Sequence, residues 1–120
     1  MRRLENELED ALRTATTVQD ALLILEELLS GGYNALPDGR LYYIKELVGQ
    51  VNNLKIYIYA EDHPPPHFHI RGGDIDAMFS IEDCSLLRGD IAGRQRGLVV
   101  WWHKRSKPVL VAAWKRNQPA

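Results

Sequence analysis

The stretch DHPPPHFHIRGGDIDAMFSI, residues 62–81, holds three of the four histidines of the chain behind a run of prolines. Two glycines, Gly72 and Gly73, separate two runs in which apolar and polar residues alternate. Such a pair predicts a two-residue hairpin turn, because glycine accepts positive φ at both central positions. We therefore expect an antiparallel hairpin with one apolar and one polar face.

The position of the turn also predicts which residues face each other. The expected pairs are Arg71 with Asp74, Ile70 with Ile75, His69 with Asp76, Phe68 with Ala77 and His67 with Met78. In this register histidines, a guanidinium and carboxylates share the polar face. That face is the candidate site.

Composition sets the class of protein. The chain has 120 residues, 45% of them hydrophobic and 26% charged, which is typical of one globular domain. No apolar run has the length of a membrane span, and Met1-Arg2-Arg3 leads into an acidic amphipathic segment instead of a signal-peptide core. The single cysteine, Cys84, excludes an internal disulfide. We expect a cytoplasmic protein with no membrane partner.

The first fifty residues have helical periodicity. Leucine and alanine recur at helical spacing in residues 4–15 and 18–29, and Thr16-Thr17 before Gln19 and Asp20 is typical of a capping box. Ser30-Gly31-Gly32 predicts a left-handed helix end, and Pro37-Asp38-Gly39 predicts a turn. Residues 41–48 fit a short helix, although residues 41–44 alone also fit a strand. The leucine face is expected to pack in the core; the alternative is a helix pair that forms a homo-oligomer.

The rest of the chain predicts strands and then helices. Strands are expected at 54–59, 67–71 and 74–81, with a fourth at 86–91 as an option. One helix should begin near Arg94, and Ser106-Lys107-Pro108 predicts the start of a second that ends near Arg116. The expected fold class is α+β: a small antiparallel sheet of three or four strands with N-terminal helices and basic C-terminal helices. We divide it into an N-terminal helical segment, 1–50, and an α+β domain, 51–120, which together form one compact unit.

These residues resemble a known family. The strand at 54–59, the block DHPPPHFH at 62–69, AMFSIED at 77–83, Leu87-Arg88-Gly89, a basic helix and a late tryptophan resemble the small bacterial domain-of-unknown-function family 4160. The resemblance covers about residues 54–116. It implies a partner protein, since such proteins tend to be encoded beside small partner genes in loci of the toxin-antitoxin kind. It implies no settled activity.

The histidine block supports three hypotheses. His63, His67 and His69 could bind a divalent metal such as zinc, with Asp76 as a fourth ligand or as a partner of a ligating histidine. His67, His69, Arg71 and Asp76 could instead be catalytic residues of a ribonuclease or other hydrolase, with Tyr57 or Tyr59 on the same face. The third hypothesis is structural: the polar residues make only cross-strand pairs and hold the proline-stiffened hairpin.

The C-terminal part of the chain is basic. From residue 94 onward there are seven basic residues and no acidic one: Arg94, Arg96, Lys104, Arg105, Lys107, Lys115 and Arg116. They are candidates for binding RNA or DNA phosphates, although an acidic partner protein would suit them equally. Trp101 and Trp102 are adjacent on a predicted helix, so at least one should lie in the core.

The functional prediction combines these observations. The chain is expected to be one component of a toxin-antitoxin-like module that binds a cognate small partner protein and nucleic acid. The alternative is a ribonuclease or metal-dependent hydrolase that uses the cluster of His63, His67 and His69.

Overall fold

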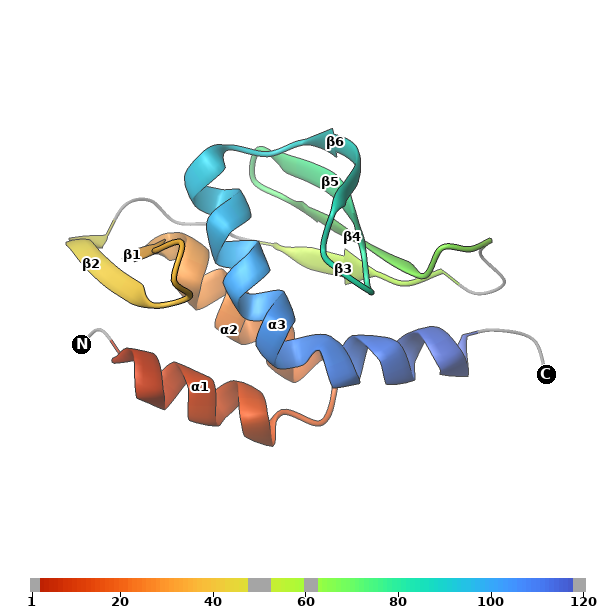
Figure 1. Ribbon diagram of the computed structural model, residues 1–120, viewed down its shortest axis with the longest axis horizontal. Helices are drawn as coiled ribbons and strands as arrows, with labels where there is room; N and C mark the ends of the chain where they lie inside the picture. Colours follow the sequence, from red (N-terminus) through yellow and green to blue (C-terminus); the bar gives the residue numbers. More distant parts are fainter. Residues whose placement is uncertain (1–2, 48–52, 60–62, 118–120) are drawn as a thin grey trace.

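The computed structural model describes residues 3–47, 53–59 and 63–117 and has the expected α+β class (Figure 1). Its elements are α1 (Glu5–Thr14), α2 (Val18–Ser30), β1 (Gly31–Ala35), β2 (Leu41–Leu47), β3 (Lys55–Tyr57), β4 (His67–Gly72), β5 (Ile75–Ser80), β6 (Leu86–Asp90) and α3 (Gly93–Arg116). β1 and β2 form a two-stranded sheet, and the other strands form a four-stranded sheet in the order β3-β4-β5-β6. All strand pairs are antiparallel. The fourth strand of the larger sheet, an option in the sequence, is therefore present.

One face of the four-stranded sheet packs against α3. Phe68 and Phe79 are fully buried, and Phe68 lies 6.0 Å from the Trp102 ring and 6.1 Å from the His103 ring, between centroids. His103 Nε2 lies 2.6 Å from the carbonyl oxygen of Ile81, just after β5. Since side chains alternate along a strand, the opposite face carries the polar residues.

The predicted hairpin register is wrong by two residues. The structure pairs Arg71 with Asp76, Ile70 with Ala77, His69 with Met78, Phe68 with Phe79, His67 with Ser80 and Gly72 with Ile75. Gly72 belongs to β4, where a Cβ atom would come within 2.7 Å of the Leu54 Cα atom, so glycine is needed there for close packing of β3. Gly73, at φ 58°, and Asp74 make the turn. A shift of two residues leaves every side chain on its predicted face.

The end of α2 also differs from the prediction. Thr17 caps the start as expected, with its Oγ1 accepting from the Asp20 N–H at 3.0 Å. At the other end Gly31 is extended, at φ −79° and ψ 175°, and the chain passes directly into β1 without a left-handed residue. The Arg94 guanidinium explains the difference, because its Nη1 donates to the Leu29 carbonyl in the last turn of α2 at 3.3 Å and its Nη2 donates to the Gly31 carbonyl at 2.6 Å.

The β1-β2 hairpin replaces the short helix that we predicted after residue 40. The turn at Pro37-Asp38-Gly39 is confirmed, with Gly39 at φ 89° and a hydrogen bond of 2.7 Å from the Leu36 N–H to the Arg40 carbonyl. Residues 41–47 form a strand, which was the alternative interpretation for residues 41–44 alone. Pairing with β1 favours the strand over the helix. This pairing cannot be predicted from the pattern of residues 41–47 alone.

α3 is one helix where the sequence predicted two. Pro108 lies inside it, and Figure 1 shows that α3 changes direction about halfway along its length. Ser106 does not cap a new helix; its Oγ donates to the Trp102 carbonyl at 2.8 Å. Buried residues continue on both sides of the proline, so packing keeps the helix intact despite the lost backbone hydrogen bond.

The N-terminal elements pack on α3 and share its core. Trp101 and Trp102 are both buried, and Trp102 Nε1 donates to the Ala21 carbonyl in α2 at 2.7 Å. Leu8, Leu12, Leu25 and Leu28 are buried in the same hydrophobic cluster as Phe68 and Phe79. The boundary that we predicted near residue 50 lies outside the described residues. Among the helices that the structure describes, none combines the length and the apolar character needed to cross a membrane.

Candidate functional site

The exposed face of the four-stranded sheet, here called the outer face, gathers polar side chains from all four strands. Its residues form two cross-strand rows: Lys55, Arg71, Asp76 and Asp90 in one, and Tyr57, His69, Met78 and Arg88 in the other. The alternation of the strands places them together. The first row has cations next to carboxylates, and the second has an aromatic ring next to a histidine.

His69 and Asp76 form the closest polar contact on the outer face. His69 Nε2 lies 2.7 Å from Asp76 Oδ1, and the His69 side chain is 13% exposed whereas that of Asp76 is 66% exposed. The carboxylate can only accept, so the nitrogen that faces it carries a hydrogen. Nδ1 is therefore the atom left to exchange a proton, and it has no hydrogen-bond partner within the described part of the chain.

Arg71 completes this group from the next position along β4. Its Nε lies 3.5 Å from Asp76 Oδ1. The hydrogen bond from His69 lowers the pKa of Asp76, and the positive charge of Arg71 lowers that pKa further. Asp76 thus stays ionised at neutral pH and orients His69.

Two tyrosines extend the outer face beyond His69. The Tyr57 ring lies 6.5 Å from the His69 ring, and the Tyr57 and Tyr59 rings are stacked with centroids 5.8 Å apart and planes 4° apart. Tyr59 is 47% exposed. Lys55, Arg71 and Arg88 are also exposed. Aromatic rings thus lie beside cations on one continuous surface.

His67 does not belong to this group. It is 4% exposed, its ring lies 5.4 Å from that of Trp114 in α3, and its Nδ1 lies 2.7 Å from the Pro65 carbonyl oxygen. Three of the four candidate catalytic residues, His69, Arg71 and Asp76, therefore come together, while His67 is held at the start of β4.

The metal hypothesis required His63, His67 and His69 to converge. The rings of His63 and His67 lie 5.9 Å apart, while His69 turns to Asp76. Over residues 3–47, 53–59 and 63–117 the structure has no group of three or more His, Cys, Asp and Glu side chains placed to hold a metal ion.

The basic candidates of α3 are dispersed and partly occupied. Arg94 binds the carbonyl oxygens at the end of α2, and Arg105 pairs with Glu9 at 2.7 Å and lies 3.8 Å above the Trp101 ring. Lys107 donates to the Glu82 carbonyl at 2.8 Å. The exposed members are Arg96, Lys104, Lys115 and Arg116. Arg94 and Arg105 are thus committed to packing within the chain.

Lys55 and Arg88 belong to the outer face but were not predicted as site residues. Lys55 faces Arg71 across β3 and β4, and Arg88 faces Met78 across β5 and β6. The alternation in residues 54–59 was a usable signal for Lys55. Arg88 had none, because a register shift in the pairing of β5 with β6 decides its face.

The fold and the outer face define a small α+β domain with a polar, aromatic sheet surface. The chain belongs to the family described as a domain of unknown function (DUF4160), which it matches over residues 53–115. This match confirms the family resemblance and covers the four-stranded sheet and nearly all of α3. No curated protein and no solved structure matches the chain. The elements α1, α2, β1 and β2 lie outside the matched part.

Proposed function

We propose that the outer face binds single-stranded RNA and that the protein is the RNA-binding component of a cytoplasmic, toxin-antitoxin-like pair. The observation that carries the proposal is the stacked pair Tyr57 and Tyr59 beside three exposed cations, Lys55, Arg71 and Arg88. Exposed aromatic rings on a sheet stack on unpaired bases, and cations bind the phosphates between them.

The partner protein is inferred from the family. Proteins that resemble this one tend to be encoded beside small partner genes, and this tendency supports a second protein that binds this one. The outer face and the surface of α3 lie on different sides of the sheet, so RNA and a protein have separate surfaces available.

RNA cleavage is a second candidate function. The hydrogen bond of 2.7 Å from His69 Nε2 to Asp76 Oδ1 favours it. His69 Nδ1 would take the proton of a 2′-hydroxyl, whose oxygen attacks the adjacent phosphorus. The bond from phosphorus to the 5′-oxygen then breaks, the 5′-oxygen takes a proton from water, and a 2′,3′-cyclic phosphate remains. Arg71 would stabilise the negative charge on the phosphoryl oxygens.

The binding proposal is tested with a fluorescein-labelled RNA 12-mer and fluorescence anisotropy. We expect Tyr59→Ala to weaken binding by roughly 5- to 150-fold, since stacking contributes about 1–3 kcal/mol per base. Arg71→Gln should reduce the slope of log K against log salt concentration by about one unit. The matched control is Tyr42→Ala, because Tyr42 is an exposed tyrosine on the other sheet. Equal binding by the Tyr59 and Tyr42 variants, or no binding at low salt, would contradict the proposal.

A further inference from the structure

One exposed face of α3 combines cations with apolar side chains. Gly97, Val100, Lys104, Pro108, Val111 and Lys115 follow one another at spacings of three or four residues and form what we call the α3 stripe. Residues at these spacings lie on one side of a helix. Val100 is 45% exposed, which is high for a valine on a helix that packs in the core on its other side.

The α3 stripe is bordered by hollows. A groove of about 510 Å³ separates α3 from α1, and a second of about 480 Å³ separates α3 from the turn between β1 and β2. A third hollow, of about 600 Å³, follows the C-terminal half of α3 past Val111 and Ala112. Lys104 lines all three. The hollows therefore meet at this lysine.

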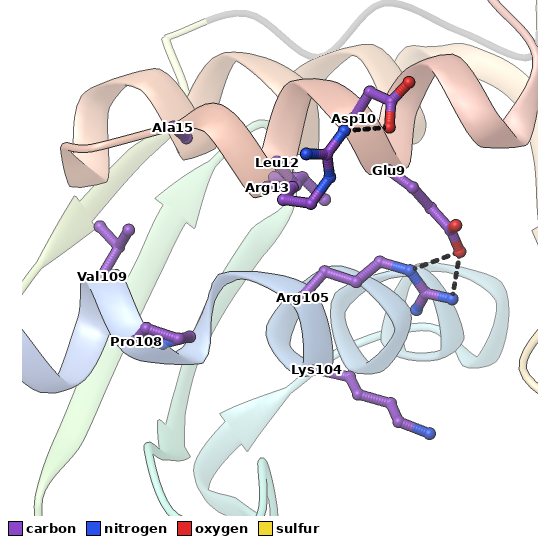
Figure 2. A pocket seen from close by; sticks show the side chains of 9 residues that line it. All are labelled: Glu9, Asp10, Leu12, Arg13, Ala15, Lys104, Arg105, Pro108 and Val109. Atoms are coloured by element: carbon purple, nitrogen blue, oxygen red, sulfur yellow. Dashed lines mark hydrogen bonds and ion pairs between the residues drawn. The ribbon is translucent and has the colours of Figure 1, made fainter.

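The cations of the α3 stripe are available for a partner. Figure 2 shows that Arg105 reaches Glu9, whereas Lys104 points away from α1. Within the described residues, Lys104 and Lys115 make no hydrogen bond or ion pair. Residues 93–116 include no acidic side chain that could neutralise them. Glu9, Asp10 and Asp38 line the same hollows as Lys104 without pairing with it, so in the described part of the chain the two lysines stand unpaired beside exposed apolar atoms.

α1 shows what kind of structure packs against α3. It is an acidic amphipathic helix that buries Leu8 and Leu12 and pairs Glu9 with Arg105, with Oε1 2.7 Å from Nη2 and 3.0 Å from Nε. Its partner surface on α3 is the neighbouring side of the same helix. The α3 stripe repeats this combination of apolar and basic groups, and neither α1 nor α2, the other helices within residues 3–47, 53–59 and 63–117, covers it.

We propose that the α3 stripe binds an acidic amphipathic helix of the partner protein, an inference that rests on the two-protein part of the proposed function. Counted along α3 at about 1.5 Å per residue, the stripe from Gly97 to Lys115 follows the bend of α3 for about 27 Å, or about five helical turns. A protein helix is favoured over nucleic acid because apolar residues separate the cations, whereas a phosphate backbone is bound by closely spaced cations and polar groups.

The test uses a synthetic 18-residue peptide labelled with fluorescein. Leucines spaced alternately three and four residues apart form one face of its helix, and glutamates lie on both sides of that face. It is titrated into the full chain. We expect Lys104→Glu to weaken binding at least 10-fold and a peptide with lysine in place of glutamate to regain affinity for that variant. Val111→Glu should weaken binding of the glutamate peptide similarly.

The control variant is Lys55→Glu, which changes an exposed lysine on the outer face. It should weaken RNA binding and leave peptide binding unchanged. Lys104→Glu should weaken peptide binding and leave RNA binding unchanged. Failure of RNA binding alone would contradict the proposed function and not the helix site. Peptide binding that is equal for wild type and Lys104→Glu, absence of peptide binding, or loss of RNA binding in Lys104→Glu with no effect on the peptide would each overturn the helix site.

Discussion

Asp76 is a small, exposed residue that determines the tautomer of His69. Its carboxylate accepts the Nε2–H of His69 at 2.7 Å, which sets the tautomer and leaves Nδ1 for proton transfer. The hydrogen bond from His69 lowers the pKa of Asp76, so this carboxylate remains charged as the pH falls to well below neutrality. His67, two residues earlier, has the same side-chain chemistry but is buried against Trp114.

We expect Asp76→Asn to reduce RNA cleavage by roughly 100-fold, because the amide can no longer hold the required tautomer and acid–base catalysis typically contributes about 10²–10⁴-fold. Binding of the RNA should change less than about threefold. The measurement is a denaturing gel of end-labelled RNA, with a 2′-deoxy oligonucleotide as the uncleavable control. Cleavage that persists unchanged in Asp76→Asn, or cleavage of the deoxy control, would refute the assignment.

At the scale of the elements, Arg94 connects α3 to the end of α2. It donates to the carbonyl oxygens of Gly31 and Tyr33, and Tyr33 is itself a fully buried residue of the core. A helix end must satisfy its last carbonyl groups, and here Arg94, more than sixty residues away, also donates to the Leu29 carbonyl at 3.3 Å and the Leu28 carbonyl at 3.4 Å. These contacts allow α2 to run directly into β1.

Arg94→Met should therefore lower the free energy of unfolding by about 2–4 kcal/mol, since it removes several hydrogen bonds to partly buried carbonyl oxygens. The matched control is Arg96→Met, an exposed position on the same helix, where we expect a change within about 0.5 kcal/mol. Urea titrations followed by tryptophan fluorescence give both values. Equal stability of the two variants would show that the hydrogen bonds of Arg94 do not stabilise the fold.

At the scale of the whole molecule, one core joins the N-terminal elements to the domain of the family. α3 lies between them, with Trp102 hydrogen-bonded to α2 and His103 hydrogen-bonded to Ile81 at the end of β5. Burial lowers the pKa of His103, and the nearby charge of Lys107 lowers it further, while Asp83 and the bond to Ile81 act in the opposite direction. The imidazole in the centre of the fold is thus held neutral.

The sign of the pH effect follows from that lowered pKa. Below the usual value of 6.5 the unfolded chain binds a proton at His103 that the folded chain does not, so stability is complete above this pH and falls as the pH drops toward the folded-state value. The slope contributed by one proton is at most about 1.4 kcal/mol per pH unit. We expect His103→Gln, whose amide can still donate to Ile81, to flatten the loss of stability between pH 6.5 and 5. An unchanged slope in urea titrations across this range would contradict the explanation.

The sequence by itself determined the family, through the motif DHPPPHFH and the runs around it, and its helical and alternating periodicities determined the α+β class and the faces of the β4-β5 hairpin. The faces were right even though the register was not, because a shift of two residues preserves the alternation. His69, Arg71 and Asp76 could thus be placed together from residues 67–76 alone.

Tertiary structure decided what local sequence does not encode. The backbone of Leu54 requires Gly72 inside β4, Arg94 ends α2, and packing on both sides keeps α3 intact through Pro108. It also separated His67 from His69 and brought Tyr57 beside His69 across two strands. Each of these outcomes depends on contacts between residues distant in the chain, and such contacts override the preferences of a short segment because they contribute more to the free energy of folding.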